Sequence, residues 1–159
     1  MMNAQVRKAT LADAEVACNV LRRSITECCI EDHREDSEVL FNWLQNKTPD
    51  NLARWFANHD NFSLVATVSE QIVGVGLLTV RGEVALCYVL PEARFNGIGK
   101  ALLDLMELHA IQIQLGEIHL SSTSTAKTFY QSRGFLPSGE PKIESGVRAF
   151  PMTKRIIGK

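Results

Sequence analysis

The sequence has no long hydrophobic run and no excess of either charge. None of its apolar runs approaches the roughly 18 residues of a membrane-spanning helix, and the opening MMNAQVRKAT lacks the apolar core of an export signal. We therefore expect a cytoplasmic protein without a membrane partner. The 17 Lys and Arg against 18 Asp and Glu leave a formal net charge of -1, which provides no general attraction for nucleic acid.

Cysteine is scarce and badly spaced for metal binding. The four cysteines are Cys18, Cys28, Cys29 and Cys87, and the adjacent pair cannot form the CxxC geometry of a zinc site. No second Cys or His pair stands at ligand spacing. We therefore expect no metal and reduced, structural thiols.

Internal repeats, low-complexity tracts and linker-like stretches are also absent. The chain has 159 residues and is 45% apolar, which is enough to bury a core of its own. We therefore expect one domain that spans residues 1–159.

The first third of the chain shows helical periodicity after one short strand at residues 4–9. Thr10 and Asp13 have the spacing of a capping box, which predicts a helix over residues 11–28. Two shorter helices are predicted, one at residues 39–44 and one that begins after Thr48 as its N-cap.

From residue 62 the apolar pattern changes to a period of two. Three strands joined by short turns predict an antiparallel meander over residues 62–90. A long helix is predicted over residues 98–115, with Gly116 as its left-handed C-cap. The remaining predicted elements are a strand at 117–122, a helix at 124–133 that ends at Gly134, and strands at 135–140 and 147–156, with Pro151 at a bulge or an edge.

The predicted order is β-α-α-β-β-β-α-β-α-β-β, an α/β fold (α+β mixed sheet) with about seven strands and helices on both faces. A strand, a long helix and a further strand require a parallel pair, here residues 84–90 and 117–121. Ligands of such sheets bind outside the carboxyl ends of parallel strands. We therefore expect the ligand site where these two strands end.

The stretch ARFNGIGKALLDLM, residues 93–106, enters the long helix through an arginine and two glycines. A helix start offers unpaired N–H groups and partial positive charge, and glycines let an anion approach the backbone. Arg94 and Lys100 add fixed charge on either side. The stretch is neither a P-loop nor a complete dinucleotide-binding fingerprint. It favours a pyrophosphate cradle, with a tight turn whose glycines serve only packing as the alternative.

YVLPEARFNGIGKALLDLM resembles the acetyl-CoA-binding motif of the GNAT N-acetyltransferase superfamily, [QR]-x-x-G-x-[GA] after a strand that ends in V-x-P. About thirty residues on, STAKTFYQSRGF resembles the A-x-x-F-Y-x-x-x-G-F helix of that family. The opening VRKATLADAEVACNVL is similar to the first strand and helix of the family. The resemblance covers essentially the whole chain, and it implies acetyl transfer from acetyl-CoA to an amine.

The resemblance also implies which residues bind acetyl-CoA. Backbone groups near the end of the third meander strand would hold the acetyl carbonyl and the pantetheine arm, and the glycine-containing loop would hold the pyrophosphate. The residues concerned are Cys87, Tyr88 and Val89, then Arg94, Phe95, Asn96, Gly97, Ile98, Gly99 and Lys100, then Thr123 and Ser124. Many relatives carry Asn where Thr123 stands, so the last contact departs from the family pattern.

Two residues are candidates for catalysis. The resemblance places Tyr130 at the position of the proposed general acid of the family. A phenol with a pKa near 10 stays protonated at pH 7, so it can donate a proton. The alternative is a Tyr130 that only packs, with its hydroxyl satisfied. Glu83 has the spacing of a catalytic Glu in histone-acetylating members, and an ordinary turn residue is its alternative. A water chain or His119 could serve as the base instead, whereas we expect His109 to be structural.

The acceptor is the least defined part of the prediction. The acidic stretch EDHREDSE, residues 31–38, carries five carboxylates that could attract a cationic amine, or it is a solvated loop. We expect a small polyamine-like or amino-group metabolite, with protein lysines or N-termini as the alternative. Two further alternatives are a non-catalytic acyl-CoA-binding module and an interaction protein that exposes Phe41, Trp43 and Trp55. A homodimer is left open.

Overall fold

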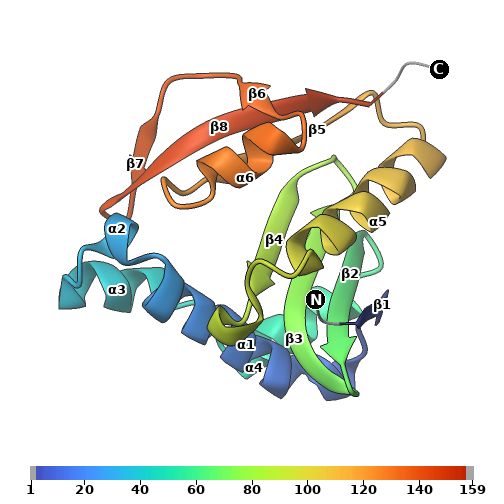
Figure 1. The fold of residues 1–159 in the computed structure, drawn as a ribbon, viewed down its shortest axis with the longest axis horizontal. Helices are drawn as coiled ribbons and strands as arrows, with labels where there is room; N and C mark the ends of the chain where they lie inside the picture. The colour runs from blue at the N-terminus through green and yellow to red at the C-terminus, as the bar shows by residue number, and fades with distance from the viewer. Residues whose placement is uncertain (1–2, 157–159) are drawn as a thin grey trace.

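The computed structural model describes residues 3–156 and begins with an antiparallel meander (Figure 1). The strands β1 (Ala4–Lys8), β2 (Asn61–Val68), β3 (Gln71–Thr79) and β4 (Val84–Val89) form one four-stranded sheet in the order β1-β2-β3-β4. The turn between β2 and β3 places Ser69 and Glu70 at φ 50° and 68°, as tight hairpins with the right-handed strand twist require. The predicted meander is confirmed.

A second four-stranded sheet contains the other strands of the described residues. Its central strand is β8 (Val147–Arg155), with β5 (Glu117–Ser122) on one side and β6 (Leu136–Pro137) and β7 (Lys142–Glu144) on the other. All of these pairs are antiparallel. The short strand β7, which forms a hairpin with β8, was not predicted from the sequence.

Within residues 3–156, one isolated backbone bridge connects the two sheets. Glu83 and His119 form an isolated parallel bridge, in which the His119 N–H donates to the Gly82 carbonyl over 2.9 Å. Figure 1 shows β4 and β5 leaving each other beyond it. The sequence predicted a parallel pair along residues 84–90 and 117–121, but the parallel pairing is limited to this one bridge. The strands therefore form two sheets, and not the single continuous mixed sheet that was predicted. The Tyr130 hydroxyl interacts with Cys87 of β4, and both residues belong to the core cluster on the α5 side of the sheet.

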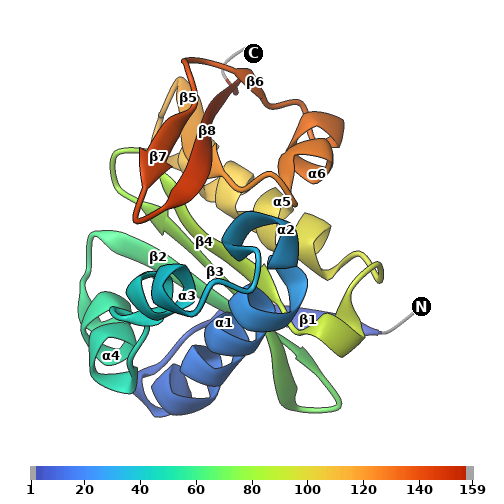
Figure 2. The ribbon, with the colours of Figure 1, turned by 90° about the vertical axis from the view of Figure 1, so that its left-hand side faces the viewer.

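Helices cover both faces of the first sheet, as predicted (Figure 2). α1 (Ala14–Cys28) and α4 (Pro49–Ala57) pack on one face, where Leu21 and Leu52 are fully buried. α5 (Ile98–Gln112) packs on the other face. Its core cluster includes Ile118 of β5 and Met152 of β8, so this helix joins the two sheets. The shorter helical elements are η1 (Leu11–Asp13), α2 (Ile30–His33), α3 (Ser37–Leu44), η2 (Pro91–Ala93) and α6 (Lys127–Ser132).

The predicted helix boundaries are confirmed where a side chain caps the helix. Thr10 and Asp13 form the capping box ahead of α1, and Thr48 accepts the Asn51 N–H at the start of α4 over 3.1 Å. Gly116 as the C-cap of α5 is wrong. The helix ends in a Schellman motif whose left-handed residue is Gln114, at φ 66°, and the Leu115 N–H bonds to the Ala110 carbonyl.

Pro151 does not lie on an edge strand, but it does lie at an irregularity of one ladder of β8, because residues 138–141 stand opposite residues 150 and 151 alone. β8 is an interior strand, and its register with β5 runs unbroken through the Ser121–Pro151 pair. The Pro151 carbonyl accepts the Ser138 N–H over 3.0 Å. Proline has no N–H group, and the N–H and C=O of one residue point to the same side of an antiparallel strand. The position without an N–H donor therefore faces the segment where the neighbour of β8 changes from β7 to β6.

Within residues 3–156 no helix is long and apolar enough to cross a bilayer. Over the same residues, no three His, Cys, Asp or Glu side chains gather in a way that could hold a metal ion. All four cysteines are free thiols.

Candidate functional site

The loop between β4 and α5 leaves the start of α5 without a side-chain cap. Gly97 is the N-cap residue at φ 80°, and no side chain in the described part of the chain caps the helix there. The first helical bond runs from the Ala101 N–H to the Gly97 carbonyl over 3.0 Å, so the N–H groups of residues 98–100 point out of the helix end. The Asn96 amide holds the loop by donating to the Arg94 carbonyl over 2.9 Å. The start of α5 therefore presents unpaired backbone N–H groups, a feature that favours an anion.

The two glycines of this loop have different physical roles. Gly97 supplies a left-handed conformation that an L side chain rarely adopts. A Cβ on Gly99 would instead lie 3.1 Å from Cζ of Phe129 on α6. The space beside Gly99 is therefore filled by Phe129, whereas the sequence interpretation assigned it to a phosphate. What Gly99 and Ile98 present at the helix start is backbone, since the Ile98 side chain is buried in the core.

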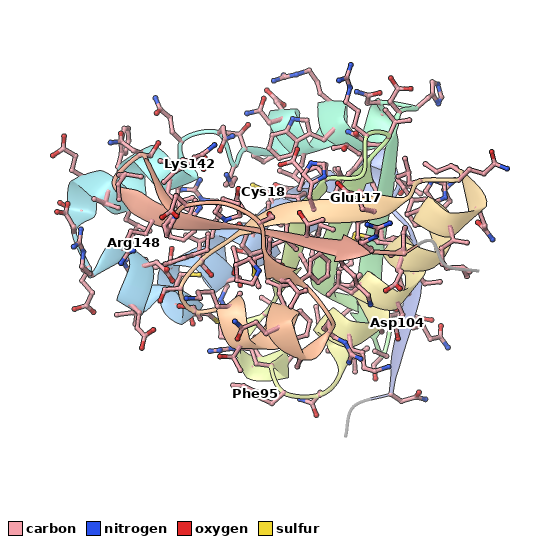
Figure 3. All side chains as sticks on the ribbon, turned by 90° about the horizontal axis from the view of Figure 1, so that it is seen from above. Cys18, Phe95, Asp104, Glu117, Lys142 and Arg148 are labelled. Atoms are coloured by element: carbon pink, nitrogen blue, oxygen red, sulfur yellow. The ribbon has the colours of Figure 1, made fainter. Side chains whose placement is uncertain are left out.

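Three more of the predicted pyrophosphate residues lie around this helix start. The Arg94 guanidinium lies over the ring of Phe95, 4.7 Å from its centroid. Phe95 is 90% exposed at φ 65°, and Figure 3 shows it at the outer edge of the molecule. The Lys100 ammonium bonds to Asp104 over 2.9 Å, with both side chains about half exposed. The loop thus brings two cations and an exposed aromatic face to one helix end.

The Tyr130 phenol is buried beside β4. Its residue is 7% exposed, and its ring meets Phe129 and Phe135 edge-on with centroids 5.1 Å and 5.6 Å away. A hydrogen bond joins Tyr130 to the thiol of Cys87. Burial raises the pKa of Tyr130 well above its ordinary value, and it raises the pKa of Cys87 to about 12. Both groups stay protonated at neutral pH, so this cluster can donate a proton and holds no ready nucleophile.

A second aromatic contact connects β4 to the helices on the other side. Trp43 of α3 hydrogen-bonds to the Tyr88 hydroxyl, whose pKa is raised chiefly by burial. Trp43 also meets the buried His33 ring edge-on at 6.4 Å. His33 accepts the Glu35 N–H at Nδ1 over 3.0 Å, and its Nε2 lies 3.0 Å from the Thr26 carbonyl. These contacts hold α2 and α3 against the end of β4.

Asp32 ties α2 to the loop between β5 and α6. Its carboxylate accepts the Ser124 N–H over 2.7 Å and the Thr125 hydroxyl over 2.6 Å, across 92 and 93 residues of sequence. The Thr123 hydroxyl accepts the Ala126 N–H over 3.1 Å. Sequence reasoning placed Thr123 and Ser124 here but missed Asp32. No local pattern could have found it, because its partners are so distant in the chain.

A pocket of about 490 Å³ opens between α3, the start of β4, the end of β5 and the β7–β8 hairpin. Glu83 lines this pocket with an exposed side chain, and its N–H donates to the Thr79 hydroxyl over 3.0 Å. His119 shares the parallel bridge with Glu83 but is not among the pocket's lining residues. His109 lies far from this pocket and stacks on Phe62 at 3.9 Å. Of these two candidates for the base, only Glu83 is among the lining residues of the pocket.

The acidic stretch 31–38 does not present five free carboxylates. Asp32 is buried in the tie described above, and Asp36 caps α3 by accepting the N–H groups of Glu38 and Val39. The hypothesis of an acidic surface that attracts amines is weakened accordingly. The predicted alternative of an exposed patch formed by Phe41, Trp43 and Trp55 is wrong. Phe41 is 65% exposed, whereas both tryptophans are half-buried and pack inward.

Comparison with known proteins gives one family. Residues 29–156 match the family model described as acetyltransferase (GNAT) domain. A GCN5-related N-acetyltransferase structure from Rhodopseudomonas palustris superposes with a TM-score of 0.86, at 21% identity over 98% of both chains. The PaiA N-acetyltransferase of Thermoplasma acidophilum, in complex with coenzyme A, gives a TM-score of 0.83 at 24% identity over 97% of this chain and 99% of that one.

A curated relative matches a shorter stretch. The amino-acid acetyltransferase of Pseudomonas putida is 40% identical over 62 residues, which is 39% of this chain. The match covers 14% of that longer protein.

Proposed function

Because the chain belongs to the acetyltransferase (GNAT) family over residues 29–156, we propose that it moves the acetyl group of acetyl-CoA directly to a primary amine of a small molecule. The observation that carries this proposal is the uncapped first turn of α5, packed through Phe129 against the helix that holds the buried Tyr130 phenol. An anion site and a proton donor thus lie on two helices in direct contact. Acetyl-CoA is the donor substrate, and the reaction needs no metal.

We propose that the loop and the gap between the sheets bind the donor. The N–H groups of residues 98–100, with Arg94 and Lys100 beside them, suit a pyrophosphate. The edge of β4 at Cys87, Tyr88 and Val89 faces the gap toward β5, where the described residues form no ladder beyond Glu83. An extended pantetheine arm can pair with such an edge, as added strands do. PaiA, with the same fold, binds coenzyme A.

The proposed reaction needs one residue that accepts a proton from the amine and one that donates a proton to the leaving thiolate. An alkyl amine has a pKa near 10.4 and must lose a proton before it attacks the thioester carbonyl. We propose Glu83 as the base, acting directly or through water, because it lines the pocket next to the gap. When the C–N bond has formed and the C–S bond breaks, the coenzyme A thiolate takes the Tyr130 proton. The raised pKa of Tyr130 keeps that proton in place until then.

Replacement of Tyr130 by Phe tests the proposal. Y130F keeps the ring contacts with Phe129 and Phe135 and removes only the hydroxyl, so we expect kcat to fall about 100- to 10,000-fold, the usual worth of general acid catalysis. The dissociation constant for coenzyme A, measured by calorimetry, should stay within about twofold. Y88F, which removes the second phenol of the chain, should cost far less. Unchanged turnover in Y130F would end the assignment.

A non-catalytic acyl-CoA-binding module is the rival function. It requires the same cradle but no proton donor, so release of the coenzyme A thiol separates the two. We expect thiol release when acetyl-CoA is mixed with an amine library. Bound acetyl-CoA that stays intact with every amine and with peptide substrates would favour the rival. Amino acids enter the library because the curated relative is an amino-acid acetyltransferase, and small polyamines enter it because the sequence alone predicted that class.

A further inference from the structure

The 490 Å³ pocket carries charges of both signs that no protein partner neutralises. Its lining includes the carboxylates of Glu83 and Glu144 and the cations of Lys47 and Arg148. Within residues 3–156, none of these four side chains forms an ion pair with another residue. The lining of this pocket therefore offers both carboxylates and cations to a ligand that enters it.

Lys47 is the cation whose position is most informative. It is half-buried, and burial lowers the pKa of its ammonium group. The one hydrogen bond of its ammonium group within the described residues goes from Nζ to the side-chain oxygen of Asn46 over 2.8 Å. A partly buried ammonium with a single neutral partner is poorly stabilised, and an anion at that place would stabilise it. Arg148, whose guanidinium lies over the Phe150 ring at 5.1 Å, is also among the lining residues of this pocket.

We infer that the acceptor carries a carboxylate as well as its amine and that Lys47 binds this carboxylate. The inference rests on the proposed acetyl transfer and names its substrate class, an amino acid or another zwitterion of that size. Glu83 receives the amine end, since it lines the same pocket at the start of β4 next to the gap. Arg148 of β8, which is also among the lining residues, supports the anionic end.

Matched acceptors that differ only in the carboxylate test the substrate class. Lysine is compared with cadaverine, and ornithine with putrescine, in the wild-type protein at fixed acetyl-CoA. We expect kcat/KM to be about 10- to 100-fold higher for the member with the carboxylate, the usual worth of a charge-assisted hydrogen bond. Equal or better use of the diamine would overturn the inference and leave the proposed function standing. No acetylation of any amine, with acetyl-CoA bound, would remove the proposed function and the inference together.

The variant K47M tests the assigned residue. Met keeps the length of the side chain and removes the charge, so the KM for the carboxylate acceptor should rise about 10- to 100-fold. The KM for the matched diamine, the KM for acetyl-CoA and the melting temperature should change little. K142M is the control, because Lys142 is an exposed lysine on the β7–β8 hairpin and does not line the pocket. A K47M variant that loses both acceptors equally contradicts the assignment.

Discussion

At the scale of single residues, the two glycines at the start of α5 can be told apart by substitution. G97A places a Cβ at φ 80°, and we expect it to lower the free energy of unfolding by about 1–2 kcal/mol. G99A keeps a good helical conformation but brings its Cβ to 3.1 Å from Phe129, so its cost is one of overpacking, about 1–3 kcal/mol. Urea denaturation measures both.

A second substitution supplies the control for this pair. F129L shortens the side chain that meets Gly99, so G99A should become neutral or stabilising in that background, because Ala favours a helix more than Gly does. G97A should keep its full cost, since its strain lies in the backbone. If F129L rescued both variants alike, the distinction between the two glycines would be wrong.

At the scale of secondary-structure elements, the start of α1 depends on one charged contact. Asp13 accepts two hydrogen bonds from Arg7 of β1, over 2.8 Å and 3.0 Å, and one from the Thr10 N–H. The bond to Arg7 lowers the pKa of Asp13 from 3.8 to about 2, against the opposing effect of burial. A lowered pKa in the folded state means that the stabilisation is present above about pH 4 and is lost as pH falls toward 2.

D13N should therefore destabilise the protein in a pH-dependent way. At pH 7 we expect a loss of about 1–2 kcal/mol, because Arg7 is half-exposed and water screens the pair. The difference from wild type should shrink as pH falls below 4 and nearly vanish near pH 2. Denaturation curves at several pH values check this. D50N, in the exposed first turn of α4, should show a small difference at all of them.

At the scale of the whole molecule, Asp32 connects the helices of the first half to the loop that precedes α6. D32N keeps the size of the side chain but removes its charge and one acceptor oxygen. We expect a stability loss of about 1.5–3 kcal/mol, faster hydrogen exchange at the Ser124 and Thr125 amides, and a lower kcat because the loop carries the helix of Tyr130.

The N-cap residue of α3 offers the matched control for this tie. D36N replaces one good N-cap with another, so stability and exchange at residues 124 and 125 should stay close to wild type. A D32N protein with unchanged exchange at those two amides would show that the carboxylate does not hold the loop in solution.

Local patterns explain which parts of this molecule could be predicted. The meander, α5 and the caps at Thr10 and Thr48 follow from periodicity and from short-range hydrogen bonds, and the structure confirms them. The glycine-containing entry to α5 was also visible in the sequence, and its binding of a pyrophosphate stays a prediction. The C-cap of α5 was misplaced by two residues, because a left-handed Gln114 carries no sequence signal comparable to that of a glycine.

What could not be predicted depends on contacts between distant segments. The place where β4 and β5 separate is one such feature, and the tie at Asp32, which spans 92 residues, is another. The pocket has walls from α3 and from the β7–β8 hairpin, which approach so closely that a Cβ on Gly146 would lie 2.9 Å from Val39. None of these pairs shares a local pattern, so periodicity is silent about them.

The burial of the thiols has a practical consequence for chemical labelling. Maleimides and iodoacetamide react with the thiolate, and a thiol with a pKa of about 12, such as those of Cys29 and Cys87, holds only about one thiolate in 100,000 at pH 7. Cys18 is buried as well. A fluorophore added at neutral pH will therefore attach at Cys28, the last residue of α1, and the natural sequence already offers a single-site dye position without any cysteine being replaced.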